Sequence, residues 1–198
     1  MRRAVVDTNV LVVANGRNTN AAPACREASI RALMALLADG VIVLDVAKAI
    51  LKEYREYCSP SGQPGVGDRF FYEVLMRYDG KVLRVDLPIN DEGQYTHFPT
   101  DPELSGFDRS DRKFAAAARV GRAPVLNATD TDWHEFADPL ARHGIQVRFL
   151  CGEDTELWFA PDPPPHPVTR TRTGITHGSG PPIRTANRSR PAKPGEGR

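Results

Sequence analysis

Four acidic residues lie where a fold could gather them, namely Asp7, Glu53, Asp111 and Asp130. Two of them come at or just beyond the ends of short apolar runs, and the other two lie on helical segments that follow or precede such runs. Carboxylates brought together without a counter-charge repel by roughly 4 kcal/mol per pair at about 4 Å and an effective dielectric near 20. A site that tolerates several carboxylates therefore needs a cation, and oxygen-only ligands suit Mg²⁺ or Mn²⁺. The pattern predicts metal-dependent phosphodiester chemistry.

The elements that must position these residues follow from the alternation of apolar runs with amphipathic stretches. We expect buried strands at residues 3–6, 41–44, 82–87, 125–127 and 145–150. We expect helices at about residues 24–38, 46–57, 70–80, 110–120 and 134–142, with loops at 15–23, 59–67 (a flap over a groove) and 88–107. Strands that alternate with helices predict an α/β fold with a parallel sheet covered on both faces. Such sheets bind ligands beyond the carboxyl ends of their strands, which is where Asp7 and Asp130 fall.

Cysteine and histidine usage argues against disulfide and zinc frameworks. The three cysteines, Cys25, Cys58 and Cys151, are far apart in the chain and form no Cys-x-x-Cys pair. The five histidines are scattered, with no His-Glu-x-x-His pair. We therefore expect reduced thiols in a cytoplasmic protein.

Composition is that of an ordinary globular protein. The chain has 198 residues, 40% hydrophobic and 26% charged, which is enough for one domain with a core. No apolar run approaches the ~20 residues that span a bilayer, so no membrane association is expected. The N-terminal apolar stretch is interrupted by Asp7 and Asn9, which speaks against a signal peptide.

The net charge of +1 conceals an asymmetry between the body of the chain and its C-terminal end. Residues 160–198 contain seven Lys and Arg against two Asp and Glu, which leaves 19 against 23 for residues 1–159. From Pro161 onward the chain holds nine of its 17 prolines and no Phe, Trp or Tyr, so it cannot bury enough apolar surface to offset chain entropy. We expect a globular domain over residues 1–159 and a disordered basic tail over 160–198. The tail either contacts phosphates or only adds solubility.

Four segments resemble, in order and spacing, the acidic motifs of PIN domains, small nucleases of the kind found in VapC-type toxins. They are Val5–Leu11, Ile50–Tyr54, Asp111–Ala118 and Asp130–Trp133. The resemblance spans roughly residues 3 to 150. One position departs from the family pattern, because many relatives have a hydroxyl residue two places before the last aspartate and this chain has Ala128 there, with Thr129 adjacent.

The resemblance implies a three-layer α/β/α domain with a mainly parallel sheet and Mg²⁺- or Mn²⁺-dependent cleavage of RNA. It further implies either the toxin of a type II toxin–antitoxin pair, with a cognate antitoxin protein as partner, or a housekeeping role in RNA processing. Members of the family commonly form homodimers, so a homodimer is also expected. The candidate catalytic residues and metal ligands are Asp7, Glu53, Asp111 and Asp130. Ligand carboxylates would be oriented by Thr8, Asn9 and Asp132.

Each candidate also has a purely structural interpretation. Asp7 could cap a strand and start a turn, and Glu53 could be a solvated helix residue paired with a neighbouring cation. Asp111 could serve the first turn of a helix, where the helix dipole favours any acid, with Asp108 as a competing site. Asp130 could form an Asx-type turn with Asp132. For Trp133 and the Phe70–Phe71 pair, we expect a place in the core rather than a base-stacking role.

Two rival functions differ in class from a nuclease. A phosphatase that is phosphorylated on aspartate would also place Asp7 after a first strand, but it needs a second aspartate two residues on, where this chain has Asn9. A non-catalytic PIN-like module that binds RNA or protein would have lost its acidic residues, and all four are present. A cleavage assay with Mn²⁺ and a chelator control separates the nuclease from the non-catalytic binding module.

Overall fold

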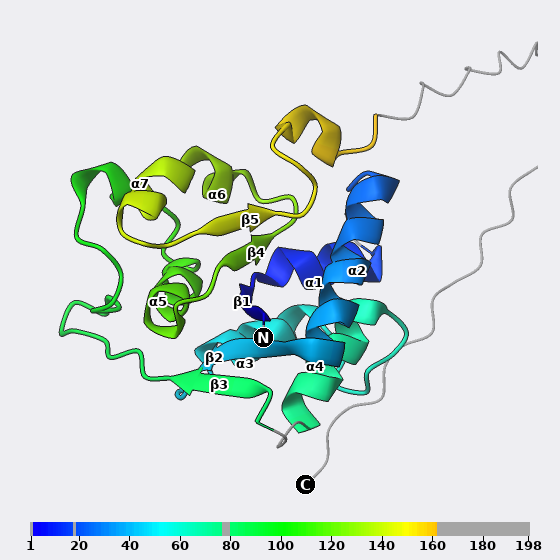
Figure 1. The fold of residues 1–198 in the computed structure, drawn as a ribbon, viewed down its shortest axis with the longest axis horizontal. Coiled ribbons are helices and arrows are strands. Elements are labelled where there is room, and N and C mark those ends of the chain that lie inside the picture. Colours follow the sequence, from blue (N-terminus) through cyan, green and yellow to red (C-terminus); the bar gives the residue numbers. More distant parts are fainter. Residues whose placement is uncertain (1, 18, 77–79, 162–198) are drawn as a thin grey trace, which may run out of the picture. The chain divides into compact units, whose positions relative to one another are not determined.

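A computed structural model describes residues 2–17, 19–76 and 80–161 (Figure 1). Five strands form one parallel sheet in the order β3-β2-β1-β4-β5, with β1 at its centre. The strands are β1 (Arg2–Val6), β2 (Gly40–Asp45), β3 (Val82–Val85), β4 (Val125–Asn127) and β5 (Val147–Phe149). The expected α/β class and the five expected strands are confirmed, although β3 and β5 are shorter than predicted.

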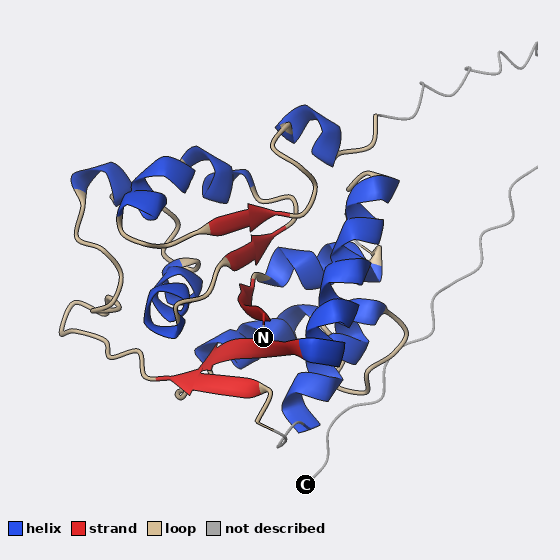
Figure 2. Ribbon diagram, viewed as in Figure 1, coloured by secondary structure: helices blue, strands red, loops and turns tan. Residues whose placement is uncertain are grey.

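Helices cover both faces of the sheet, as Figure 2 shows. On one side α1, α2 and α4 pack against one another, and on the other side α5 contacts four of the five strands (Figure 1). The first group of helices comprises α1 (Thr8–Asn15), α2 (Pro23–Asp39) and α4 (Val66–Met76), and α3 (Ala49–Tyr57) contacts both α1 and α5. The second comprises α5 (Arg112–Gly121), α6 (Thr131–Glu135) and α7 (Ala137–Arg142), and the two 3-10 turns are η1 (Pro102–Leu104) and η2 (Thr155–Trp158).

The direction of winding reverses at β1. The chain proceeds from β1 to β2 and β3 on one side, then returns to β4 and β5 on the other. In open parallel sheets, ligands bind beyond the carboxyl ends of the strands at such a reversal. The reversal falls between β1 and β4, so the edge after these two strands is where a binding site is expected.

Small residues let α5 lie close to the sheet, as predicted. All four alanines of residues 115–118 are buried. A Cβ on Gly121 would come within 2.7 Å of the Val43 side chain, so a larger residue there would push α5 away from β2. Close packing of these small residues therefore holds α5 against the sheet.

Helix α1 was not predicted. Its Val10, Val12 and Val13 are β-branched residues that favour strands, but the helix is fixed by its ends and by its packing. It ends at Gly16, whose φ of +64° is a left-handed conformation that glycine adopts readily. It also packs against α4 where a Cβ on Gly67 would lie 2.2 Å from a backbone oxygen of α1.

Helix α4 begins at Val66, inside the loop expected at 59–67, and the last turn predicted for it, at residues 77–79, lies outside the described residues.

Two further helix predictions differ in their boundaries for local reasons. Helix α3 begins at Ala49 rather than at residue 46, because the buried Asp45 carboxylate accepts hydrogen bonds from Ala49 N at 2.7 Å and Ile50 N at 2.9 Å. The single helix predicted for residues 134–142 is two helices, which meet at Phe136. In both cases a local hydrogen bond or turn overrides the apolar periodicity.

The prediction of reduced thiols is wrong for two of the three cysteines. Cys25, on α2, and Cys151, after β5, form a disulfide, whereas Cys58 is free and buried. The paired residues are 126 positions apart, so their spacing carries no signal that could reveal the pairing. The disulfide and a hydrogen bond from Ala22 N to Trp158 O at 2.8 Å hold the segment after β5 against the start of α2.

The loop predicted as a flap, residues 59–67, is tied to a buried acid. Asp68 is inaccessible to solvent and accepts hydrogen bonds from Ser59 N at 2.8 Å and Gly65 N at 2.9 Å. It also pairs with Arg17 at 2.6 Å. These contacts anchor both ends of the loop.

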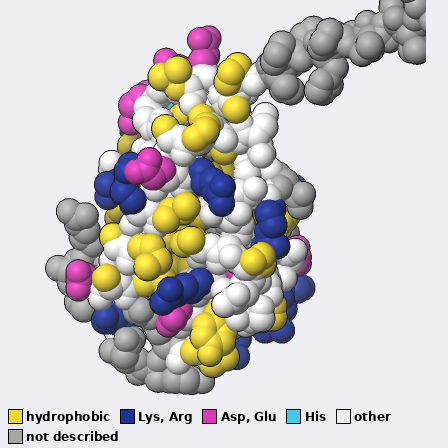
Figure 3. Space-filling view, turned by 90° about the vertical axis from the view of Figure 1, so that its right-hand side faces the viewer, with side chains coloured by type: hydrophobic (Ala, Val, Ile, Leu, Met, Phe, Trp, Pro, Cys, Tyr) yellow, Lys and Arg dark blue, Asp and Glu magenta, His cyan; other side chains and the backbone are white. Residues whose placement is uncertain are grey.

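Among the described residues, no helix is both long and apolar enough to cross a bilayer. On the face shown in Figure 3, charged side chains of both signs are scattered among hydrophobic ones, so this face does not form a continuous basic surface. The basic tail predicted for residues 160–198 lies outside the described residues from residue 162 onward.

Candidate metal centre

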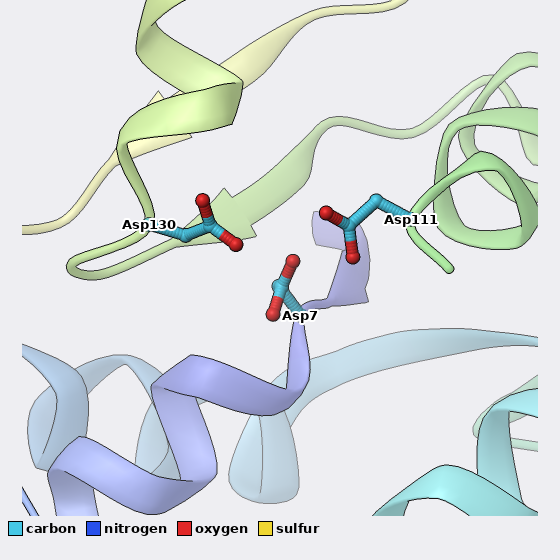
Figure 4. Close-up of side chains that lie close together, drawn as sticks. All are labelled: Asp7, Asp111 and Asp130. Atoms are coloured by element: carbon cyan, nitrogen blue, oxygen red, sulfur yellow. The ribbon is translucent and has the colours of Figure 1, made fainter. Parts of the chain in front are cut away.

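Three aspartates meet at the edge of the sheet where its winding reverses. Asp7 follows β1, Asp130 precedes α6 two residues after β4, and Asp111 precedes α5. One carboxylate oxygen from each lies within 4.8 Å of the others, and the three side chains point toward one another (Figure 4). Three of the four acids singled out in the sequence are thus brought together from separate elements of the fold.

The carboxylate of Asp7 is fixed at both oxygens. Its Oδ1 accepts a hydrogen bond from the backbone N–H of Asn9 at 2.8 Å, which caps the start of α1. Its Oδ2 accepts one from Nε1 of Trp133 at 2.5 Å. The residue is 3% exposed, so protein donors replace the water that would normally solvate it.

Asp111 and Asp130 stand at the starts of helices on the other side of the group. Asp111 is buried and occupies the N-cap position of α5, but its side chain does not cap the helix, which leaves the carboxylate directed at the site (Figure 4). Asp130 is half-buried and accepts a hydrogen bond from Asp132 N at 2.9 Å, which caps α6. The N-terminal ends of two helices therefore face the group, and their dipoles favour negative charge there.

Burial and mutual repulsion make these acids hard to ionise. Burial is the largest cause of a rise in the pKa of Asp7 to about 7, to which the charges of Asp130 and Glu53 contribute. The pKa of Asp111 is raised to about 8, again by burial first and then by Asp7 and Asp130. Burial also raises the pKa of Asp130. A divalent cation among the three carboxylates would reverse all three effects, since it favours the ionised form of each.

Glu53 lies beside the group of three rather than within it. Its Oε1 accepts a hydrogen bond from Thr8 Oγ1 at 2.5 Å, and its Oε2 forms an ion pair with the amino group of Lys113. The sequence suggested a cation close to Glu53 along the chain as its partner, but the cation comes from α5. The Thr8 hydroxyl therefore orients Glu53 rather than one of the three aspartates.

Asn9 and Asn127 join the ends of β1 and β4. The side chain of Asn9 donates to Asn127 Oδ1 at 2.7 Å and accepts from Ala128 N at 2.8 Å. Asn127 in turn donates to the backbone oxygen of Asp130 at 2.8 Å. This network fixes the turn that carries Asp130. It includes the backbone N–H of Ala128, which occupies the position where the motif usually has a hydroxyl residue.

Some of the purely structural interpretations also hold. Asp130 does form an Asx-type turn with Asp132, which contributes its backbone N–H. Asp108 accepts a hydrogen bond from Ser110 N at 2.6 Å on the exposed side of the turn before α5, as expected for the competing site. Trp133 is fully buried in the core, as predicted, and contacts the site as well.

Sequence reasoning missed Trp133, Asn127 and Lys113 as parts of the site. Asn127 carried a recoverable signal, because it is a polar residue at the end of an apolar strand and is fully buried. Lys113 lies on the predicted helix of Asp111, but its partner Glu53 is 60 positions away in the sequence. Nothing in the local sequence indicates that the Trp133 indole reaches Asp7, 126 positions away.

The donor set fits a hard divalent cation. Each of the three aspartates offers a carboxylate oxygen and no nitrogen or sulfur, and such ligands suit Mg²⁺ or Mn²⁺. Lys113, two residues after Asp111, is already paired with Glu53. The geometry supports a cation-binding role for the three aspartates.

Comparison with known proteins leaves the family open. No family model matches the chain, and no curated protein matches it. One solved structure to which it is similar is the crystal structure of VapBC2 from Rickettsia felis bound to a DNA fragment from their promoter, with 13% sequence identity and a TM-score of 0.43. The match covers 74% of this chain and 98% of that chain. Likeness at this level does not establish a shared family, so function has to be inferred from the site.

Proposed function

We propose that the protein is a PIN-type ribonuclease that hydrolyses RNA phosphodiester bonds with Mg²⁺ or Mn²⁺. The observation that carries this proposal is the convergence of Asp7, Asp111 and Asp130 at the reversal point of a parallel sheet, with one oxygen from each within 4.8 Å of the others. Buried acids with raised pKa values and a specific charge partner are characteristic of functional sites. The motif order supports nuclease chemistry in particular.

Each residue has a distinct part in the proposed site. A bound divalent ion lowers the pKa of its water and neutralises charge on the scissile phosphate. Asp7 is the rigid ligand, because both of its oxygens are held by hydrogen bonds. Asp130 is the most exposed of the three proposed ligands. Asn9 and Asp132 orient these two aspartates through their backbone N–H groups.

We assign Glu53 a role at the wall of the site. Thr8 and Lys113 hold its carboxylate beside the three aspartates, where its charge contributes to the raised pKa of Asp7 and Asp111. In the proposed enzyme Glu53 takes part in catalysis as a fourth acid close to the metal, oriented by Thr8.

The wider biological role follows from the same motifs. We propose that the substrate is RNA, that the protein is the toxin of a type II toxin–antitoxin pair, and that it assembles with a cognate antitoxin and as a homodimer. We also propose that the nuclease domain is residues 1–159, and that the basic segment 160–198 either contacts phosphates or only adds solubility. We propose a cytoplasmic location from this role alone, because the disulfide between Cys25 and Cys151 removes the support that reduced thiols would have given.

The test is cleavage of total RNA by the full chain with Mn²⁺ or Mg²⁺, with and without EDTA. We expect cleavage only with metal, and none by Asp111→Asn. Asp138→Asn, an exposed aspartate of α7, is the matched control and should retain full activity. Cleavage that persists in EDTA, or in folded Asp111→Asn, would contradict the proposal. RNA binding without cleavage under all metal conditions would favour the non-catalytic binding module.

A further inference from the structure

The indole of Trp133 contacts the most deeply buried of the three aspartates. Its Nε1 donates a hydrogen bond to Oδ2 of Asp7 at 2.5 Å, and its side chain is fully buried. Trp133 lies on α6, three residues after Asp130. One short helix therefore carries both a candidate metal ligand and the donor that holds another.

Aromatic packing fixes the orientation of this indole. The ring of Phe107 meets it edge-on, with ring centroids 4.9 Å apart and an interplanar angle of 73°. Phe107 is itself packed against Phe98 at 5.7 Å and Phe136 at 5.6 Å. Because the indole is enclosed in this way, its N–H has little freedom to turn away from Asp7.

The hydrogen bond constrains how Asp7 can present itself. An indole N–H only donates, so the oxygen that it contacts must accept. The other oxygen accepts from Asn9 N at 2.8 Å, so each oxygen has one donor from the protein and a further lone pair for another contact. The contact with Trp133 also opposes the effect of burial on the pKa of Asp7, since it favours the ionised form.

We propose that Trp133 is a positioning residue that orients the Asp7 carboxylate for the divalent cation, and so sets the affinity of the site for metal. The inference rests on the proposed function, since it concerns the same site. Unlike a lysine or arginine, the neutral indole orients the carboxylate without adding a positive charge that would compete with the cation. Partners of this kind typically change metal affinity by about 10- to 100-fold when removed.

The chain provides a matched control in its other tryptophan. Trp158 is also fully buried and also donates its N–H, but to Gly152 O at 2.9 Å on the segment after β5. Trp→Phe at either position removes an indole N–H and leaves a similar void. Only the change at Trp133 removes a hydrogen bond to one of the three aspartates.

The first test measures Mn²⁺ binding to the full oxidised chain by titration calorimetry. We expect Trp133→Phe to weaken binding by about 10- to 100-fold, and Trp158→Phe to change it by no more than about twofold. In an Asp7→Asn background, Trp133→Phe should have no further effect, because the carboxylate that it orients is gone. Equal affinity of Trp133→Phe and wild type would overturn the inference while leaving the proposed function intact.

The second test does not require a change at Trp133, so it applies even where Trp133→Phe does not fold. Because the chain has two tryptophans, the Trp158→Phe protein reports from Trp133 alone. We expect saturating Mn²⁺ to quench its emission. Binding to Trp158→Phe without a change in emission would overturn the inference. If the wild-type protein binds no Mn²⁺, the inference and the proposed function both fail.

Discussion

The most informative perturbation of the metal-free protein is Asp111→Asn. Asp111 is 8% exposed, and its side chain does not cap its helix, so the substitution removes a buried charge without breaking a cap. At 4.8 Å and an effective dielectric near 20, each pair of charged carboxylates in the group repels by about 3.5 kcal/mol. Neutralising Asp111 removes two of the three repulsive pairs.

The sign of the effect follows from the raised pKa. The pKa of Asp111 rises from an ordinary value of 3.8 to about 8 on folding. Such an acid lowers the free energy of unfolding as pH rises from its pKa in the unfolded chain to its pKa in the folded protein. Above the folded-state pKa, it causes no further loss. At roughly 1.4 kcal/mol per pKa unit, the largest loss of unfolding free energy that this pKa shift can cause is about 6 kcal/mol. Since the site opens toward the half-buried Asp130, water screens part of this, and we expect Asp111→Asn to gain about 2 kcal/mol at pH 8.

The assay is urea denaturation in EDTA between pH 4 and pH 9, with the disulfide kept oxidised. The gain from Asp111→Asn should be absent near pH 4, grow up to pH 8 and then level off. Asp101→Asn is the control with the opposite sign, because a hydrogen bond to His143 lowers the pKa of Asp101 and its loss should reduce stability. If wild-type stability does not fall between pH 4 and pH 8, or if Asp111→Asn gains nothing there, the electrostatic reasoning is refuted.

Three further predictions concern the metal, the ion pair beside the site and the disulfide. Mn²⁺ at about 100 times its dissociation constant should stabilise the wild-type protein by about 2.7 kcal/mol but not Asp111→Asn, as measured by thermal unfolding. Lys113→Met should cost about 3 kcal/mol in urea denaturation, because it leaves the largely buried Glu53 unpaired, and adding Glu53→Gln should restore part of that loss. Reduction of Cys25–Cys151, which closes a loop of 126 residues, should lower stability by about 5 kcal/mol, as seen by denaturation with and without dithiothreitol.

The elements that position the site could be predicted because they are set by local sequence. Short apolar runs such as residues 125–127 gave the strands, and the polar residues just beyond them gave the candidate ligands. Alternation of strands with helices implied a parallel sheet, and in a parallel sheet the residues after each strand share one edge. Asp7 and Asp130 were therefore expected on the same edge before any distance was known.

The partners of these residues could not be predicted, because they depend on contacts between distant parts of the chain. The amino group that pairs with Glu53 comes from α5, and the indole that holds Asp7 comes from α6. Both Lys113 and Trp133 are buried side chains whose local patterns fit a core position equally well. The spacing of apolar residues shows which face of a helix is buried. It does not show which side chain from another element packs against that face.

The two clear failures have the same origin. Helix α1 contains a run of valines that favours a strand, but the segment is helical, with close packing against Gly67 of α4. The disulfide joins Cys25 to Cys151, whose proximity depends on how the segment after β5 returns to α2. Tertiary contacts decided both, so neither propensity nor cysteine spacing could reveal them.

The central claim is that Asp7, Asp111 and Asp130 together bind a divalent cation. Anomalous diffraction from crystals grown with Mn²⁺ tests this directly. The account predicts a strong peak among the three carboxylates that is lost in crystals of Asp111→Asn. Saturating Mn²⁺ with no peak there, or with one that persists unchanged in Asp111→Asn, would contradict it.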